Sequence, residues 1–243
     1  GRKQLAIMPD SQMNSMGGQA FDQMKQKTPP ETNPRVVNYV RCVAMAVAHE
    51  AEDDTGVKDW EVQVFKDDTA NAFALPGGKI GVHTGLLKVA VTPGQLAAVL
   101  GHEVGHVIAR HGNERVSQTS VAGLGMAGLS AAMGSSEPST TKTALFTALG
   151  LGVNGVILKY SRTHESEADI IGQRLMAHAG FDPAESIELW KNMAKAGGGQ
   201  PPEFMSTHPS HETRIGDLQG NLPQVRPIYE GAKSSGKNPQ CRM

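Results

Sequence analysis

The sequence has few cysteines, few aromatic residues and no excess of charge of either sign. Only 2 of its 243 residues are Cys, and a chain of this length can bury a core without disulfides, which excludes the small disulfide-stapled proteins. Lys and Arg number 23 against 24 Asp and Glu. No basic excess could therefore neutralise a row of phosphates, and we expect no nucleic-acid partner.

Long apolar runs are also missing. No segment reaches the roughly 18 to 20 apolar residues that a membrane-spanning helix needs. The nearest, residues 144–158, is short and interrupted by Thr, Gly and Asn. We expect a buried helix there, with a position at a membrane interface as the alternative. Any signal peptide or lipid anchor is expected to lie upstream of Gly1.

The two cysteines, Cys42 and Cys241, lie near opposite ends of the chain, and neither belongs to a C-x-x-C motif. A disulfide between them would tie the C-terminal tail to an early helix in an oxidising compartment. In a reducing compartment both would be free thiols. The sequence leaves both alternatives open.

Hydrophobic periodicity predicts a mainly helical α+β domain with one small sheet. Apolar residues recur at helical spacing from residue 34 to about 52. Residues 61–65 alternate as in a strand, and residues 72–75 and 79–83 flank the turn sequence Pro76-Gly77-Gly78 as a hairpin. These three segments are expected to form the sheet.

No internal repeat and no linker between two cores is evident. We therefore expect an N-terminal arm or short helix over residues 1–34, one domain over residues 35–220, and a polar tail over residues 221–243. Within the domain, residues 134–143 have the composition of an exposed polar loop, and residues 197–202 that of a break between helices.

One helix has a well-marked start. Thr92, Pro93 and Gln95 suit the N-cap, N1 and N3 positions of a capping box. Ten residues beyond the cap, His102-Glu103-Val104-Gly105-His106 forms an H-E-x-x-H motif. The helix that carries the motif is otherwise mostly apolar.

The spacing of this motif is typical of a metal site. Positions i and i+4 lie about 40° apart on one helical face, so both imidazoles can reach one ion while Glu103 lies close without binding. A chance match is expected in about one chain per hundred. The alternative, two surface histidines and a solvated glutamate, is disfavoured because unpaired polar groups in an apolar helix are costly.

A catalytic zinc site also needs a third protein ligand and an open position. The metzincin arrangement is excluded, because Ala109 and Gly112 stand where Gly and the third His are required. Glu165 is the best candidate. Glu165 and Asp169 are again i and i+4, so one carboxylate can bind metal while the other accepts a hydrogen bond from a ligand histidine. A solvated acidic helix face is the alternative.

A di-iron carboxylate bundle is a rival metal chemistry. It requires two E-x-x-H pairs on separate helices. Glu103 and His106 supply one pair, but no other His of the chain has a Glu three residues before it. This class is therefore excluded.

The chain resembles the forty-eighth family of metallopeptidases, gluzincins that include HtpX, BepA, LoiP and OMA-like proteases. The resemblance covers about residues 71–217. It rests on five ordered motifs: NAFALPGGKIGVHTGLL, HEVGH, SRTHESEAD, AGFDPAE and THPSHETR. It implies a zincin-type (gluzincin) fold with a small β-sheet edge beside the H-E-x-x-H helix. The absence of membrane spans points to the soluble periplasmic branch, whose members are often lipoproteins.

The resemblance also implies roles for single residues. One Zn²⁺ would be bound by His102, His106 and Glu165, with Glu103 as general base. His208 matches a histidine that binds the metal at rest or stabilises the oxyanion. The resemblance further places Asp169 behind a ligand histidine and Arg214 as the arginine of the last motif. His111, His164 and His211 adjoin the motifs but lack the spacing of ligands, so we expect them to be structural.

The expected function is zinc-dependent cleavage of unfolded or misassembled proteins, in quality control of the bacterial envelope, by a periplasmic protein or an outer-membrane lipoprotein. An extended substrate would add to a strand edge, either at Asn71, Ala72, Phe73 and Ala74 or at the hairpin partner 79–83. The alternative function is a chaperone-like assembly scaffold whose zinc site is mostly closed. A purely structural zinc is disfavoured because Glu103 would then have no purpose.

Overall fold

The computed structural model describes residues 2–132, 160–196, 203–208 and 213–243. The helix expected over residues 144–158, the loop over 134–143 and the break over 197–202 lie outside this part of the chain, as does His211.

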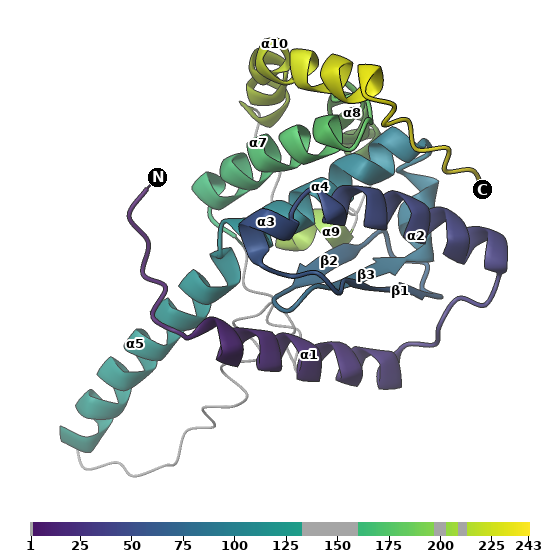
Figure 1. The fold of residues 1–243 in the computed structure, drawn as a ribbon. Helices are drawn as coiled ribbons and strands as arrows, with labels where there is room; N and C mark the ends of the chain where they lie inside the picture. Colours follow the sequence, from purple (N-terminus) through teal and green to yellow (C-terminus); the bar gives the residue numbers. More distant parts are fainter. Residues whose placement is uncertain (1, 133–159, 197–202, 209–212) are drawn as a thin grey trace.

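The described chain is a stack of helical layers on a small sheet (Figure 1). From one side to the other, α10 packs on α7 and α8, these pack on α4, α4 and α2 cover one face of the sheet, and α1 covers the other face. In chain order the described elements are α1 (Asp10–Lys27), α2 (Pro34–His49), α3 (Glu52–Thr55), β1 (Glu61–Phe65), β2 (Ala72–Leu75), β3 (Lys79–His83), the 3₁₀ helix η1 (Thr84–Lys88), α4 (Pro93–Ile108), α5 (His111–Ala132), α7 (Arg162–His178), α8 (Glu185–Ala196), α9 (Glu203–Thr207) and α10 (Thr213–Ser234).

The three strands lie where the alternation of residues 61–65 and the turn sequence Pro76-Gly77-Gly78 predict them, in the order β1-β3-β2. β1 runs parallel to β3, with Val62 opposite Ile80, and β2 forms an antiparallel hairpin with β3, with Phe73 opposite Gly81. Because β3 is paired on both sides, the prediction that residues 79–83 offer an edge to a substrate is wrong. β2 is the edge strand on the side of α4.

Both faces of the sheet are buried, one by α2 and α4 and the other by α1. Val64, Ile80 and Val82 belong to the main core with the apolar stripes of α2 and α4. On the opposite face, Phe21 of α1 packs edge-on against Phe65 of β1. Within the predicted N-terminal arm, the structure therefore has a long helix that is packed on the sheet.

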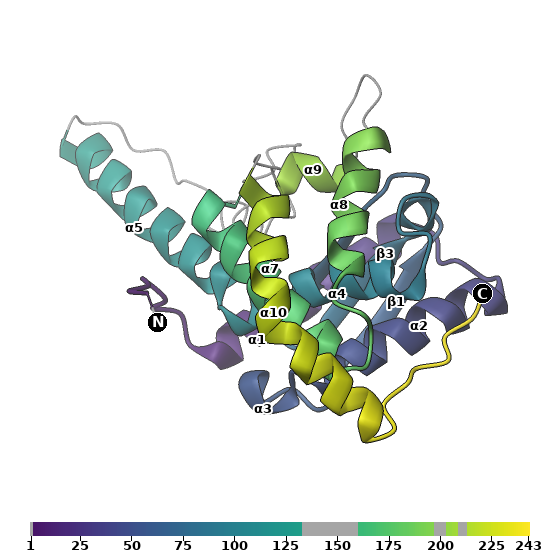
Figure 2. The ribbon, with the colours of Figure 1, turned by 90° about the horizontal axis from the view of Figure 1, so that it is seen from above.

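The C-terminal region departs from the predicted polar tail. α10 continues through Gly220, Pro223 and Pro227 to Ser234, and Figure 2 shows it from above as one long yellow helix. These residues suggest the end of a helix because Pro removes a backbone hydrogen bond and Gly weakens a helix. Packing of Leu218 and Val225 on the layer below, both buried, offsets that cost. None of the described helices is long and apolar enough to span a bilayer.

The contact of α4 with α7 is close because glycines line it. A Cβ atom on Gly101 would lie 2.7 Å from the carbonyl oxygen of Gly172, and one on Gly105 would lie 2.8 Å from that of Ala168. Real Cβ atoms do not approach a backbone oxygen so closely. The two backbones therefore meet at a distance that only glycine permits, which brings the H-E-x-x-H motif next to the acidic segment of α7.

We expect Gly172→Ala to lower the free energy of unfolding by about 1–3 kcal/mol, because its Cβ would lie 2.5 Å from the backbone nitrogen of His102. Urea denaturation measures the change. Gly220→Ala in α10 is the control, because no atom lies within 4 Å of its Cβ, and it should leave stability unchanged or raise it by up to about 1 kcal/mol. Equal stabilities of the two variants would contradict the proposed close packing.

Cys42 and Cys241 form a disulfide that joins α2 to the chain end across a sequence separation of 199 residues. The structure thus decides between the two alternatives that the sequence leaves open. Cys241 is buried against the main core, so the bond fixes the segment that follows α10.

Replacing both cysteines by alanine should lower the free energy of unfolding by about 2–5 kcal/mol, because a long loop of the unfolded chain is no longer closed. A reductant should destabilise the wild type by a similar amount and leave the double variant unchanged. A wild type that is insensitive to reduction during urea denaturation would refute this prediction.

Candidate metal centre

α4 begins as its sequence predicts and carries the motif into the interior. Thr92 Oγ1 accepts a hydrogen bond from the backbone N–H of Gln95 at 3.1 Å. The Gln95 side chain accepts from the backbone N–H of Val91, one residue before the cap, rather than from Thr92 itself. Pro93 occupies the first turn.

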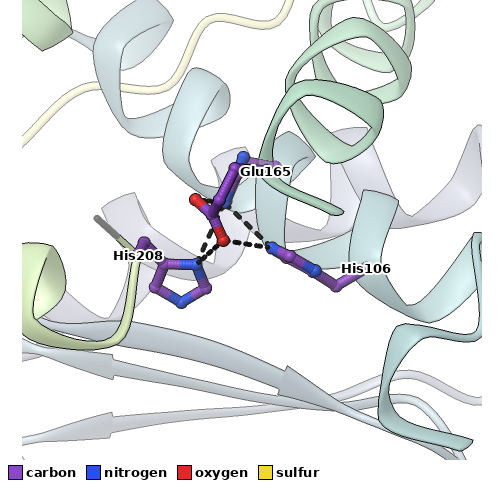
Figure 3. Close-up of side chains that lie close together, drawn as sticks. His106, Glu165 and His208 are labelled. Atoms are coloured by element: carbon purple, nitrogen blue, oxygen red, sulfur yellow. Dashed lines mark hydrogen bonds and ion pairs between the residues drawn. The ribbon is translucent and has the colours of Figure 1, made fainter. Parts of the chain in front are cut away.

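Four side chains converge at the centre of the molecule: His102 and His106 of α4, Glu165 of α7, and His208, which follows α9. One nitrogen or oxygen of each lies within 4.8 Å of those of the other three. Figure 3 shows His106, Glu165 and His208 pointing toward one another. All four residues are at most 4% exposed, so the contacts between them are shielded from water.

The distances within the group fit one bound cation. His102 Nε2 lies 3.0 Å from His106 Nε2 and 3.2 Å from His208 Nδ1. Glu165 Oε2 lies 3.5 Å from His102 Nε2, and Glu165 Oε1 lies 3.5 Å from His106 Nε2 and 3.1 Å from His208 Nδ1. Ligands at 2.0–2.1 Å from a tetrahedral zinc ion are about 3.3 Å apart. Three imidazole nitrogens and a carboxylate are also a donor set that zinc prefers, so these residues could hold Zn²⁺.

His102 is oriented by a buried ion pair. Its Nδ1 lies 2.9 Å from Asp169 Oδ1, which leaves Nε2 for the metal group. Arg214 donates to Asp169, including a bond of 2.8 Å from Nη2, and to Glu165 Oε2 at 2.9 Å from Nη1. The guanidinium carbon also lies 3.5 Å from the centre of the Trp190 ring. Arg214 therefore neutralises the two carboxylates that the i, i+4 spacing of α7 aims at α4.

Burial and charge act in opposite directions on these groups. Burial raises the pKa of Glu165, but attraction to His208 and hydrogen bonds with His106 and His208 outweigh burial and hold this pKa below its usual range. Burial lowers the pKa of His106, so its imidazole is neutral, as metal binding requires. Burial raises the pKa of Glu103, although the charges of His208 and His102 oppose the rise.

Glu103 lies beside the group without belonging to it. The backbone N–H of Ala74 in β2 donates to its carboxylate. Its Oε1 is buried and has no hydrogen-bond partner among the described residues, with His208 Nε2 at 3.4 Å. An unpaired buried carboxylate oxygen is costly unless a ligand or water satisfies it. This carboxylate can therefore meet a bound molecule at the metal group.

Two of the four residues predicted to bind substrate lie with their backbone toward the open edge of β2. Asn71 accepts a hydrogen bond from the backbone of His83 at 3.0 Å, so its backbone faces β3. Along an antiparallel pair, the backbone N–H and C=O groups of successive residues point alternately toward and away from the partner strand. The backbone groups of Phe73 therefore face β3, and those of Ala72 and Ala74 face away from it. Phe73 also packs its ring against Phe65.

Sequence reasoning missed two neighbours of His106. Tyr160 stacks on His106 with ring centroids 3.9 Å apart. His111, expected to be structural, is fully buried, and its Nδ1 lies 2.8 Å from His106 Nδ1. The sequence signal for this contact is the position of His111, five residues after the last histidine of the H-E-x-x-H motif. The Nε2 of His164 lies 3.2 Å from Glu114 Oε2, and its ring stacks on that of His111.

A helix with H-E-x-x-H, a carboxylate from a later helix and an antiparallel edge strand beside them define the zincin class of metallopeptidases in its gluzincin form. Residues 31–222 match the sequence model of Peptidase family M48. The chain belongs to this family.

Named relatives agree with this assignment. "Mitochondrial metalloendopeptidase OMA1" of Saccharomyces cerevisiae is 33% identical over 235 residues, which cover 88% of this chain and 63% of the relative. The protein of the same name in Schizosaccharomyces pombe is 35% identical, covering 81% and 56%. "Beta-barrel assembly-enhancing protease" of Escherichia coli is 30% identical, covering 88% and 44%. The chain thus spans about half the length of these relatives.

Replacing Arg214 by Met should lower the free energy of unfolding of chelator-treated protein by about 3–5 kcal/mol, because Asp169 and Glu165 lose their buried countercharge. Urea denaturation measures the loss. Lys191→Met is the control, because Lys191 pairs with Glu188 on the exposed face of α8, and its effect should stay within about 0.5 kcal/mol. An Arg214 variant as stable as this control would disprove the assigned role.

Proposed function

We propose that the protein is a zinc-dependent endopeptidase. The observation that carries the proposal is the convergence of His102, His106 and Glu165, with Glu103 adjacent and an open strand edge beside it. Membership in Peptidase family M48 and the names of its relatives support the same activity. A structural zinc would give Glu103 no function.

His102, His106 and Glu165 would hold the ion. Bound zinc supplies a Lewis acid that polarises a peptide carbonyl and makes water easier to deprotonate. Asp169 and Arg214 hold His102 and Glu165 in the orientation that binding needs. The rigid support of the ligands by buried hydrogen bonds is the contribution of the chain to metal affinity.

Glu103 would act as general base. It would take a proton from the attacking water and deliver one to the leaving amine. Its burial raises its pKa, which makes the carboxyl group a better proton acceptor than an exposed glutamate. The N–H of Ala74 fixes the carboxylate between β2 and the metal group.

A substrate would bind as an additional strand on β2. No described strand pairs with β2 on this side, and the small side chains of Ala72 and Ala74 would select little. The N–H of Ala74 already donates to Glu103 and Ala72 is only 1% exposed, so a substrate strand would have to uncover this edge and pair with the remaining backbone groups. Backbone pairing requires an extended segment, which a folded protein rarely exposes. We therefore infer unfolded or misassembled proteins as substrates, in line with a relative named for β-barrel assembly.

His208 determines whether the site is open. If all four side chains bound the ion, the site would be closed, as structural zinc sites are. Catalysis would need one position of the ion to stay available for substrate, and a His208 imidazole that does not bind the ion would be placed to donate a hydrogen bond to the oxygen that gains charge. A permanently closed site would instead fit the alternative function, an assembly scaffold that binds clients without cleaving them.

The disulfide supports an oxidising compartment as the site of action. Relatives named mitochondrial and a relative from a bacterium allow more than one such compartment. A periplasmic location, an outer-membrane lipid anchor and a role in envelope quality control therefore stay predictions.

The decisive experiment compares cleavage of casein and of a reduced, unfolded protein by the wild type and Glu103→Gln. The variant keeps the shape of the side chain and removes its basicity, so we expect cleavage to fall by about 10²–10⁴-fold. Bound zinc, measured by metal analysis, should stay equal in both proteins.

Removing zinc with a chelator should abolish cleavage by the wild type, and adding zinc should restore it. Cleavage that survives in Glu103→Gln would refute the role of Glu103. If neither protein cleaves while both retain zinc and bind the unfolded protein, the scaffold function is favoured.

A further inference from the structure

A second group of polar side chains, of which His111 is buried and Glu167 and Arg2 are partly exposed, lies directly behind the metal group. His111 begins α5, and its ring is fully buried. Its Nδ1 lies 2.8 Å from Nδ1 of His106, and its Nε2 lies 3.1 Å from Oε2 of Glu167. Arg2 donates to the same Glu167 oxygen at 2.8 Å. The contacts thus form a chain from a metal-group histidine to the N-terminal segment.

Counting hydrogens fixes the direction of this chain. His106 points Nε2 into the metal group, and this atom must carry a lone pair to bind an ion. A neutral imidazole then has its hydrogen on Nδ1. Only one hydrogen fits between two nitrogens 2.8 Å apart, so Nδ1 of His111 must accept it.

The same count defines the tautomer of His111. With Nδ1 accepting, its hydrogen is on Nε2, where the Glu167 carboxylate can accept it. An ionised carboxylate has no hydrogen to donate. Glu167 therefore disfavours the other tautomer of His111, in which two N–H groups would face each other at the contact with His106.

The backbone before His111 is held in an uncommon conformation. Arg110, between α4 and α5, has φ of 56°, the only positive φ of a non-glycine residue in the described chain. Such a conformation costs of order 1 kcal/mol and persists only where surrounding contacts impose it. The turn at Arg110 separates α4 from α5 and brings His111, the first residue of α5, next to the ring of His106.

His102 and His106 are thus each held by their own hydrogen-bonded partners, and the two sets of partners are arranged alike. His102 is held by Asp169 and Arg214. His106 is held by His111, then by Glu167 and Arg2. In both cases a carboxylate that is paired with an arginine fixes the hydrogen that keeps Nε2 free for the ion.

We propose that His111 is a positioning residue that accepts the Nδ1 hydrogen of His106 and so holds His106 ready to bind zinc, with Glu167 fixing the tautomer of His111. The proposal rests on the proposed zinc site. It gives a function to a histidine that the H-E-x-x-H motif does not include.

The test measures zinc affinity by competition with a chromogenic chelator. His111→Phe should lower the affinity by about 10–100-fold, the usual effect of removing such a partner. His111→Asn places its amide oxygen near the position of Nδ1 and should recover most of this loss. His111→Gln places its amide near the position of Nε2, too far from His106, and should resemble His111→Phe.

His164→Phe is the matched control. Its ring stacks on His111 with centroids 4.3 Å apart and its Nε2 lies 3.2 Å from Glu114 Oε2, so the side chain is not one of the links between His106 and Glu167. It should bind zinc as the wild type does, even where it lowers thermal stability. If His111→Phe does not fold, the Asn and Gln variants decide the question by their difference in affinity.

The outcomes separate the two proposals. If the wild type does not bind zinc stoichiometrically, both the proposed zinc site and the proposed role of His111 are overturned. A wild type that binds zinc and cleaves, together with His111 variants whose zinc affinity equals that of the wild type, would overturn this inference alone. Weak binding by the Phe and Gln variants with near-normal binding by Asn supports it.

Discussion

The backbone contact between α4 and α7 is the constraint on which the rest of the structure depends. Gly101 and Gly105 meet α7 so closely that no side chain fits between the helices. At that distance a glutamate on the first turn of α7 reaches the face of α4 on which His102 and His106 lie. A larger residue at the contact would separate the helices and move the third donor out of range. The site is therefore a consequence of helix packing rather than of a flexible loop.

Close packing of α4 and α7 removes charged and polar side chains from water and places like charges near one another. The residues around the site offset this cost in free energy. Arg214 balances two buried carboxylates, and His102 and His106 are held by hydrogen bonds on the nitrogens that face away from the group. What is left is a set of lone pairs directed at one point. Such an arrangement is unfavourable by itself and becomes favourable when a cation occupies that point.

Much of this could be predicted from the sequence, because the relevant signals are local. Alternation predicted the strand at residues 61–65, and the turn sequence Pro76-Gly77-Gly78 predicted the two strands that flank it. The i, i+4 spacings predicted the paired histidines and the pairing of Glu165 with Asp169. Features that depend on contacts between distant segments could not be predicted. The central position of β3 in the strand order is one such feature, and the continuation of α10 through Pro223 and Pro227 is another. The third is the contact of His111 with His106, which depends on the turn at Arg110. Residues outside the described part of the chain leave the predictions made for them open.

The central claim is that three side chains from two helices bind one zinc ion. A crystal structure of the zinc-loaded protein, with anomalous scattering recorded at the zinc edge, tests it most directly. We predict a single strong peak about 2.0–2.2 Å from Nε2 of His102, Nε2 of His106 and a carboxylate oxygen of Glu165. A peak elsewhere, or a Glu165 side chain turned away from an ion held by the histidines, would contradict the account.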